Sequence, residues 1–191
     1  YSSNLQVVRS ITSAAKNAFS SDSANTPQTI KNEDAFATQE SNLILEQNTF
    51  LGRYPGDLAN GLTIERCVAG DSAAFSNWAY VNEFDAKPET STFISNKNGQ
   101  NDEIHVVVVD GQGKFTGTKG AVLERSPFLS VAKDAKNTTG SSIYVRDVIN
   151  ERSSYVYMAG FDSDISLAQY TGSTAIGRAG SLSTDSGDDY N

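Results

Sequence analysis

The sequence predicts an α+β fold, in which a mainly antiparallel β-sheet system has a two-layer, sandwich-like arrangement flanked by a few short helices. The strongest observation is the run of residues 104–109, which is rich in β-branched side chains. Such side chains fit the pleated surface of a sheet. An Asp110-Gly111 pair follows this run and is typical of a hairpin turn. A third observation, the helical spacing of apolar residues after residue 144, adds the helical part of the fold.

Four segments have the composition and length of strands, namely residues 5–8, 62–68, 104–109 and 155–158. In the second of these, Arg66 interrupts an otherwise apolar face formed by Leu62, Ile64 and Val68. An interrupted face is typical of a strand at the edge or the end of a sheet. We therefore expect residues 62–68 to lie at such a position.

The strand at 104–109 needs a hairpin partner, and the sequence leaves two candidates open. Gly117 and Gly120 allow the chain to bend on either side of a short connection. The partner is therefore either residues 114–116 or residues 121–124. The turn itself is a type I turn with Gly113 left-handed or a two-residue Asp-Gly turn.

Three segments have the pattern of short helices. Small residues at 14–19 fit one or two helical turns. Ser126-Pro127 fits an N-cap followed by proline at the first helical position, and one helical face then carries Phe128, Val131, Ala132 and Ala135. The best supported helix follows Ser141-Ser142, since four residues have i, i+3, i+4, i+7 spacing: Val145, Val148, Ile149 and Arg152. Asp147 lies early and Arg152 late in it, as the helix dipole favours.

The 191 residues are expected to form one domain, packed over residues 1–19 and 50–160. Residues 20–47 are rich in Ser, Asp, Asn, Thr, Gln and Glu, and they bury too little apolar surface to offset their conformational entropy. We expect them to be a polar loop or the stub of an inserted domain. Residues 161–191, rich in Gly, Ser and Asp, are expected to be a weakly packed end.

The net charge of −8 and the pI of about 4.6 oppose binding to nucleic acid or to an anionic membrane surface. No run of Lys and Arg provides a local basic patch, and no apolar run reaches the roughly 20 residues that span a bilayer. A group of aromatic residues is expected to plug the core under loops, because a stacking platform for nucleic acid needs a basic groove: Trp78, Tyr80, Phe84 and Phe93.

Residues capable of chemistry are few. Cys67 is the only cysteine and His105 the only histidine, so both are expected to be strand residues packed against a sheet face. The pattern of a phosphate-binding loop requires Ser or Thr after Gly-Lys, but Phe115 follows Gly113-Lys114. The Gly-x-Ser-x-Gly pattern of a serine nucleophile is also absent. A Ser-His-Asp triad would have to use His105 in the middle of a strand. The sequence therefore assigns no catalytic residue, no cofactor-binding residue and no metal ligand.

Calcium is the strongest chemical alternative, because the chain is rich in carboxylate oxygens. The candidate ligands are Asp110, Asp162, Asp164, Asp185, Asp188 and Asp189. An EF-hand loop beginning at Asp110 would place Lys114 at its fifth ligand position, which favours a turn there instead. The competing class of function is accordingly a secreted calcium-binding or carbohydrate-binding β-rich module.

Seven short segments, taken together and in order, carry a resemblance to one known family. The longest lie in the second half, at residues 102–110, 115–124, 134–136 and 144–156. Shorter ones lie earlier, at residues 5–9, 15–18 and 53–62. Together they contain 54 of the 191 residues. Each segment alone is short, but their combination is specific, and it resembles the tail sheath protein of contractile-tailed (myovirus-type) bacteriophages.

The resemblance implies an outer-domain fragment of a structural virion protein rather than an enzyme, and it implies no cofactor. In that family the subunits form a helical sheath around the tail tube, and contraction drives the tube through the host envelope during genome delivery. The implied partners are other sheath copies, with the inner tail tube and baseplate contacted through core regions outside this fragment, and with neither nucleic acid nor membrane. The implied location is the virion tail, after assembly in the host cytoplasm. In that family, arms of the core region exchange strands between subunits. Because those arms would lie outside it, the fragment alone is expected to be monomeric.

Overall fold

The structure is a computed structural model that describes residues 10–12, 14–20, 29–39, 50–70, 72–158 and 177–183. Its strands are β1 (Asn17–Ser20), β2 (Phe50–Pro55), β3 (Leu62–Val68), β4 (Glu103–Asp110), β5 (Ala121–Ser130), β6 (Val156–Met158) and β7 (Gly177–Ser183). Its helices are α1 (Glu33–Gln39), α2 (Ser72–Ser76), α3 (Thr92–Ser95) and α4 (Val145–Arg152), with the 3-10 turns η2 (Asp57–Ala59) and η3 (Val81–Glu83). The predicted α+β fold class is confirmed, because the short helices flank strands whose pairings with one another are all antiparallel.

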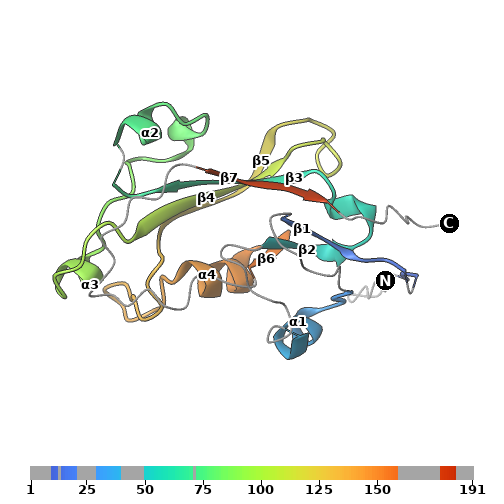
Figure 1. Ribbon diagram of the computed structural model, residues 1–191, viewed down its shortest axis with the longest axis horizontal. Coiled ribbons are helices and arrows are strands. Elements are labelled where there is room, and N and C mark those ends of the chain that lie inside the picture. Colours follow the sequence, from blue (N-terminus) through green and yellow to red (C-terminus); the bar gives the residue numbers. More distant parts are fainter. Residues whose placement is uncertain are drawn as a thin grey trace, which may run out of the picture.

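The strands form two layers that share β7. The order along the sheet is β5-β4-β3-β7-β1-β2-β6. The first part of β7 pairs with β3, and its end, at Leu182 and Ser183, pairs with β1. Figure 1 shows the β5-β4-β3 layer above the β1-β2-β6 layer, with β7 running alongside both. A strand that passes from one sheet to another in this way makes the corner of a layered fold.

Strand β4 is buried on both of its faces. Seven of its eight residues are buried, the exception being Glu103, which is partly exposed. Ile104, Val106 and Val108 point into the core between the layers. Val107 and Val109 point the other way, into a second cluster with Trp78 and Cys67. This two-sided burial explains why the sequence of β4 is apolar throughout rather than alternating.

Helix α4 covers the inner side of the β5-β4-β3 layer, next to the β1-β2-β6 layer (Figure 1). Val145, Val148 and Ile149 are buried in the central core, together with Val156 and Met158 of β6. The predicted helix is confirmed at residues 145–152, as is the strand predicted around residues 155–158. Apolar spacing of i, i+3, i+4 predicts a buried helix face well, and α4 has one.

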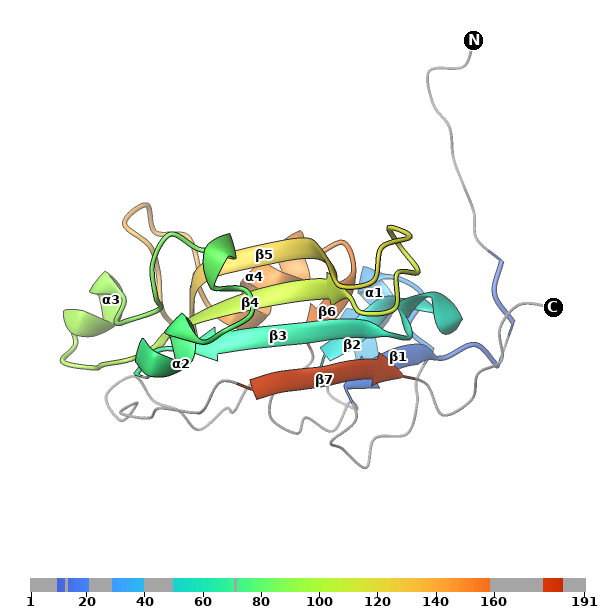
Figure 2. The ribbon, with the colours of Figure 1, turned by 90° about the horizontal axis from the view of Figure 1, so that it is seen from above.

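Helix α1 lies on the outer side of the β1-β2-β6 layer (Figures 1 and 2). Phe36 of this helix stacks on Tyr157 of β6, with ring centroids 4.4 Å apart and planes 7° apart. Ile30 and Leu51 complete the buried cluster. The helix lies in the segment that the sequence predicts to be a polar loop or stub, and these few apolar anchors are enough to hold its described part against the sheet.

The strands predicted at residues 62–68 and 104–109 are confirmed, but the edge position predicted for the first is wrong. Strand β3 lies inside the sheet, between β4 and β7. The sequence gives no signal for β7, because this strand is rich in Gly and Ser and lies in the segment for which weak packing is expected. Without β7, Arg66 is the only indication of the position of β3, and it points to the wrong one.

The helical turns predicted at residues 14–19 are wrong, because the second half of this segment is strand β1. Asn17 explains the difference. Its buried side-chain amide donates to the carbonyls of Ile30 and Gly52 and accepts from the N–H of Ile30, at 3.1, 2.8 and 2.6 Å respectively. These long-range hydrogen bonds outweigh the local helix propensity of the alanines in this segment. The strand predicted at residues 5–8 lies outside the described residues.

The hairpin partner of β4 is β5, so the second of the two predicted alternatives is confirmed. The helix predicted after Ser126-Pro127 is wrong, because β5 continues to Ser130. The β4–β5 register shifts between Ile104 and Val106, where two residues of β5, Pro127 and Phe128, lie opposite one residue of β4. Proline is tolerated here because β5 is an edge strand and the bulge needs no ladder N–H.

Candidate functional site

His105 lies opposite the β5 bulge, and its side chain is fully buried. Its Nδ1 accepts a hydrogen bond from the backbone N–H of Phe128 at 3.0 Å. Its Nε2 lies 2.8 Å from the carbonyl oxygen of Ala86. A carbonyl can only accept, so Nε2 carries the proton and the ring is neutral. One imidazole therefore ties β4 to β5 and to the segment that follows η3.

Aromatic rings enclose this imidazole. Phe84 stacks on it, with centroids 4.3 Å apart and planes 3° apart, and Phe128 meets it edge-on at 4.7 Å. Trp78 stacks in turn on Phe84 at 5.4 Å. The prediction that these aromatic residues plug the core is confirmed, since Trp78, Tyr80 and Phe84 pack with Cys67, Val107 and Val109, and Phe93 packs with Ile94 and Ala132.

The surroundings of His105 do not suit general acid–base chemistry. Both ring nitrogens have hydrogen-bond partners, and no surface of the side chain is exposed to substrate. Burial lowers the pKa of His105, and this effect outweighs the hydrogen bonds with backbone groups at Ala86 and Ile104, which raise it. Cys67 is likewise buried in a strand. The interpretation of both residues as packed strand residues is confirmed.

Asp110 organises the loop between β4 and β5. Its Oδ2 accepts from the backbone N–H groups of Phe115 and Thr116 and from the Thr116 hydroxyl, at 2.8 to 3.0 Å, and its Oδ1 accepts from the N–H of Lys114 at 2.9 Å. Burial raises the pKa of Asp110, but these hydrogen bonds together outweigh burial and lower it. The side chain of Lys114 forms an ion pair with Asp57 of η2, which fixes the loop to the rest of the domain.

A second buried carboxylate joins three segments. Asp102 is fully buried just before β4 and accepts hydrogen bonds from the N–H and hydroxyl of Ser91, at 2.7 and 2.8 Å, and from the hydroxyl of Ser130. Ser91 also caps α3 through the N–H of Ile94. Sequence reasoning missed this network, because Ser91 and Ser130 become neighbours of Asp102 only through the fold.

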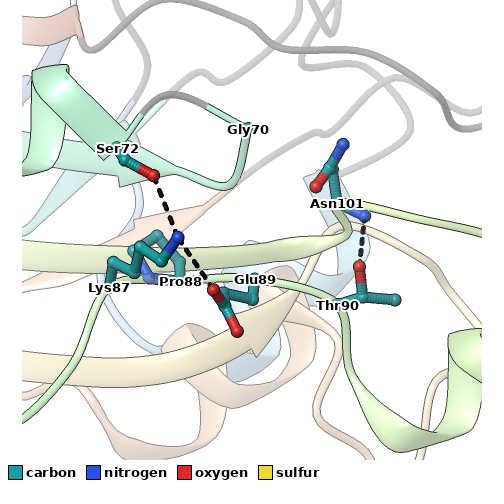
Figure 3. A pocket seen from close by; sticks show the side chains of 7 residues that line it. All are labelled: Gly70, Ser72, Lys87, Pro88, Glu89, Thr90 and Asn101. Carbon is teal, nitrogen blue, oxygen red and sulfur yellow. Dashed lines mark hydrogen bonds and ion pairs between the residues drawn. The ribbon is translucent and has the colours of Figure 1, made fainter.

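A polar pocket, shown in Figure 3, includes Thr90 and Asn101, the residues that precede Ser91 and Asp102 in the sequence. Its volume is about 350 Å³, and it is lined by Gly70, Ser72, Lys87, Pro88, Glu89, Thr90 and Asn101. Lys87 Nζ lies 2.9 Å from both Ser72 Oγ and Glu89 Oε1. A Ser-Lys nucleophile would need a lysine lone pair to accept the hydroxyl proton. Lys87 forms an ion pair with Glu89, and both side chains are exposed, so this contact is a surface interaction.

Ligand groups for metals do not gather in the part of the chain that the structure describes. Within those residues, no three His, Cys, Asp or Glu side chains lie close enough together to hold a metal ion. Of the candidate calcium ligands, Asp110 uses its oxygens to accept loop hydrogen bonds, while Asp162, Asp164, Asp185, Asp188 and Asp189 lie outside the described residues. The helices in the described ranges are all too short or too polar to cross a membrane.

The sequence of the chain is similar to that of a phage tail component. Over 122 residues the chain is 38% identical to the tail sheath protein of Salmonella phage ViI. The predicted resemblance to a tail sheath protein is confirmed. The match covers 64% of this chain but spans only 16% of the length of the sheath relative. No family model matches the chain.

Asp110→Asn is expected to destabilise the chain by about 1–3 kcal/mol at pH 7, because the amide presents N–H groups where the carboxylate accepts. Since the folded pKa of Asp110 is lowered, its contribution is present above the ordinary value of 3.8 and is lost as the pH falls through the folded value. Urea unfolding at neutral and acidic pH measures both effects.

The matched control for this substitution is Asp85→Asn, because Asp85 is exposed. We expect its effect to stay within about 0.5 kcal/mol at both pH values. Equal effects of the two substitutions at pH 7 would contradict the role assigned to Asp110.

His105 is expected to make folding stability fall in mild acid. Its folded pKa is lowered, so its contribution is complete above the ordinary value of 6.5 and is lost as the pH falls from there through the folded value. His105→Asn keeps an acceptor for the Phe128 N–H but cannot titrate. Unfolding free energies measured from pH 5 to 8 should therefore converge for the two proteins as the pH falls.

The comparison is clean because His105 is the only histidine in the chain, while carboxylates such as Glu103 titrate in both proteins and cancel in the difference. An NMR titration of the single imidazole provides the direct check. Parallel stability curves, or an imidazole pKa at or above 6.5, would show that the buried neutral ring is not the group responsible.

Proposed function

We propose that this chain is part of the subunit of a contractile phage tail sheath, in its outer region. The observation that carries the proposal is the 38% identity over 122 residues to a phage tail sheath protein. The function is structural rather than enzymatic. The chain acts in the virion, as one of many copies in a helical sheath around the tail tube, and it reaches the tube and baseplate through core regions of the longer protein.

The mechanism is mechanical. Sheath subunits change their contacts with one another as the extended sheath contracts, and the free energy comes from the difference between two sets of interfaces. Such a mechanism needs a domain that moves as a rigid body and has no need of a catalytic group. The buried side chains of Asp102 and His105, which hydrogen-bond separate segments, and of Asp110, which closes its own loop, support such rigidity.

The remaining parts of this proposal follow from the same resemblance. The 191 residues form one outer domain, contraction drives the tube through the host envelope to deliver the genome, and the sheath assembles in the host cytoplasm. The chain binds neither nucleic acid nor membrane, in keeping with its net charge of −8. At micromolar concentration the isolated chain is monomeric.

Immunogold electron microscopy of the phage that encodes this chain tests the proposal. Antibodies raised against the 191 residues are expected to decorate the outside of the tail along its whole length, in both extended and contracted particles. Antibodies against a capsid protein of the same phage are the control and should label heads only. Label confined to fibres, baseplate or capsid, or absent from intact tails, would contradict the proposal.

A calcium titration separates the proposal from the alternative of a secreted calcium-binding module. A ligand that binds only the folded state raises the melting temperature by mass action. We expect the melting temperature of the chain to be the same in excess chelator and in millimolar calcium, with magnesium as the ionic-strength control. A clear rise with calcium alone would favour the alternative function.

A further inference from the structure

The sheet has two end strands in the described part of the chain. Strand β5 stands at one end of the strand order and β6 at the other. An end strand presents backbone N–H and C=O groups along its outer edge, and a strand of another molecule can pair with them. The partners of these outer groups therefore decide whether the sheet can be extended.

The pairing of β6 with β2 shows which of its groups face outwards. The N–H of Arg53 in β2 donates to the carbonyl of Tyr155 at 2.8 Å. Hydrogen-bonded and non-hydrogen-bonded pairs alternate along antiparallel strands, so the next residue bonded to β2 is Tyr157. Val156 and Met158 accordingly turn their N–H and C=O groups away from β2, to the outer edge.

Side chains bind all of these outer groups. The amide of Asn150 in α4 accepts from the Met158 N–H at 2.7 Å and donates to the Met158 carbonyl at 2.9 Å. Ser153 Oγ accepts from the Val156 N–H at 3.0 Å, and Arg53 Nε donates to the Val156 carbonyl at 3.3 Å. An asparagine amide has the donor and the acceptor of a peptide group. Asn150 therefore takes the place that a further strand would fill.

The three capping side chains are held in position. Nη2 of Arg53 donates to the backbone carbonyl of Asn150, and its guanidinium carbon lies 4.1 Å from the centroid of the Tyr157 ring. Ser153 directly follows α4 and is buried. Figure 1 shows α4 running beside β6. The edge of β6 is thus covered without help from another chain.

The outer edge of β5 offers no backbone donor in its second half. Pro127 has no N–H, and the N–H of Phe128 is bound to Nδ1 of His105. The N–H of Ser130 points outwards, but it donates to the carbonyl of Ile143 at 2.7 Å. By the same alternation, the residue before Ser130 faces β4. A strand added along residues 127–130 would leave its carbonyls without partners.

The first half of β5 has other features that oppose strand addition. The β4–β5 register shifts a second time, between Val108 and Val109. Such a shift distorts the regular spacing that a partner strand needs. The side chain of Glu124 accepts from the N–H of Ser154 at 2.7 Å, so the segment after α4 is attached to this part of β5.

We propose that the sheet is closed at both ends against strand addition, so that neighbouring copies of this chain meet through side chains and not through shared strands. The presence of neighbouring copies rests on the proposed sheath function, whereas the closure is a property of each chain. In an assembly the local concentration of copies is high, and an open edge would pair with the nearest strand. Side-chain contacts can be exchanged when subunits move past one another, but a shared strand would have to be unpaired along its length.

Amide hydrogen exchange of the 191-residue chain tests the cap on β6. Asn150→Leu keeps the size of the side chain and removes both of its hydrogen bonds to Met158. At low protein concentration we expect the Met158 amide to exchange about tenfold faster in this variant, measured relative to the Tyr157 amide, which faces β2. Asn150→Asp is the matched control at the same position. Its carboxylate still accepts from the Met158 N–H and should keep that amide protected.

Self-association measures what the cap prevents. The double variant with Asn150→Leu and Ser153→Ala exposes both outer N–H groups of β6. At high concentration we expect light scattering to show dimers and larger species, with an association constant raised by about tenfold, and protection should return at the Met158 amide. Asn82→Leu adds the same apolar side chain at an exposed position away from both edges, and this control should stay monomeric. Protection of the Tyr157 amide establishes that each variant is folded.

The unsubstituted chain provides a test that does not depend on the folding of any variant. Its amides at residues 125–130 and 156–158 should exchange at the same rates at low and at high concentration. Protection that rises with concentration at either set would overturn the proposal. Unchanged Met158 exchange in Asn150→Leu, or a folded double variant that gains no Met158 protection at high concentration, would do the same. The immunogold result depends on none of these outcomes, so the two proposals fail separately.

Discussion

The burial of β4 on both faces is the constraint on which the rest of the fold depends. A strand that presents Ile104, Val106 and Val108 on one side and Val107 and Val109 on the other needs apolar cover above and below. Helix α4 and the β1-β2-β6 layer provide the lower cover. The segment from α2 through η3, with its aromatic side chains, provides the upper one. The layered architecture follows from this single strand.

The segment from α2 through η3 packs on β4 at one polar side chain, that of His105, and this explains the bulge in β5. His105 occupies the position between Ile104 and Val106, where an apolar residue would continue the pattern. Burying an imidazole without partners would be unfavourable. The bulge turns the N–H of Phe128 toward Nδ1, and the carbonyl of Ala86 receives Nε2. The covering segment is thus held by directed hydrogen bonds as well as by aromatic packing, and the bulge leaves Phe128 partly exposed.

The helices and strands whose own residues have a clear periodicity or composition could be predicted from the sequence. The strand at 104–109 and the helix at 145–152 have their own composition or periodicity and were predicted, and the partner at 121–124 was one of two predicted alternatives. Elements that depend on distant partners were not. Strand β1 forms because Asn17 bonds Ile30 and Gly52, β5 continues past Pro127 because His105 takes the Phe128 N–H, and β7 is a Gly- and Ser-rich strand whose only signal is the pairing itself.

The polar groups that looked like candidate chemistry have a shared structural role. Asp102 directly precedes β4, His105 lies within it and Asp110 is its last residue. Each of these side chains forms hydrogen bonds with neighbouring backbone or hydroxyl groups. A hydrogen-bonded buried network favours a unique, rigid arrangement, and buried groups engaged in it are not presented to a substrate.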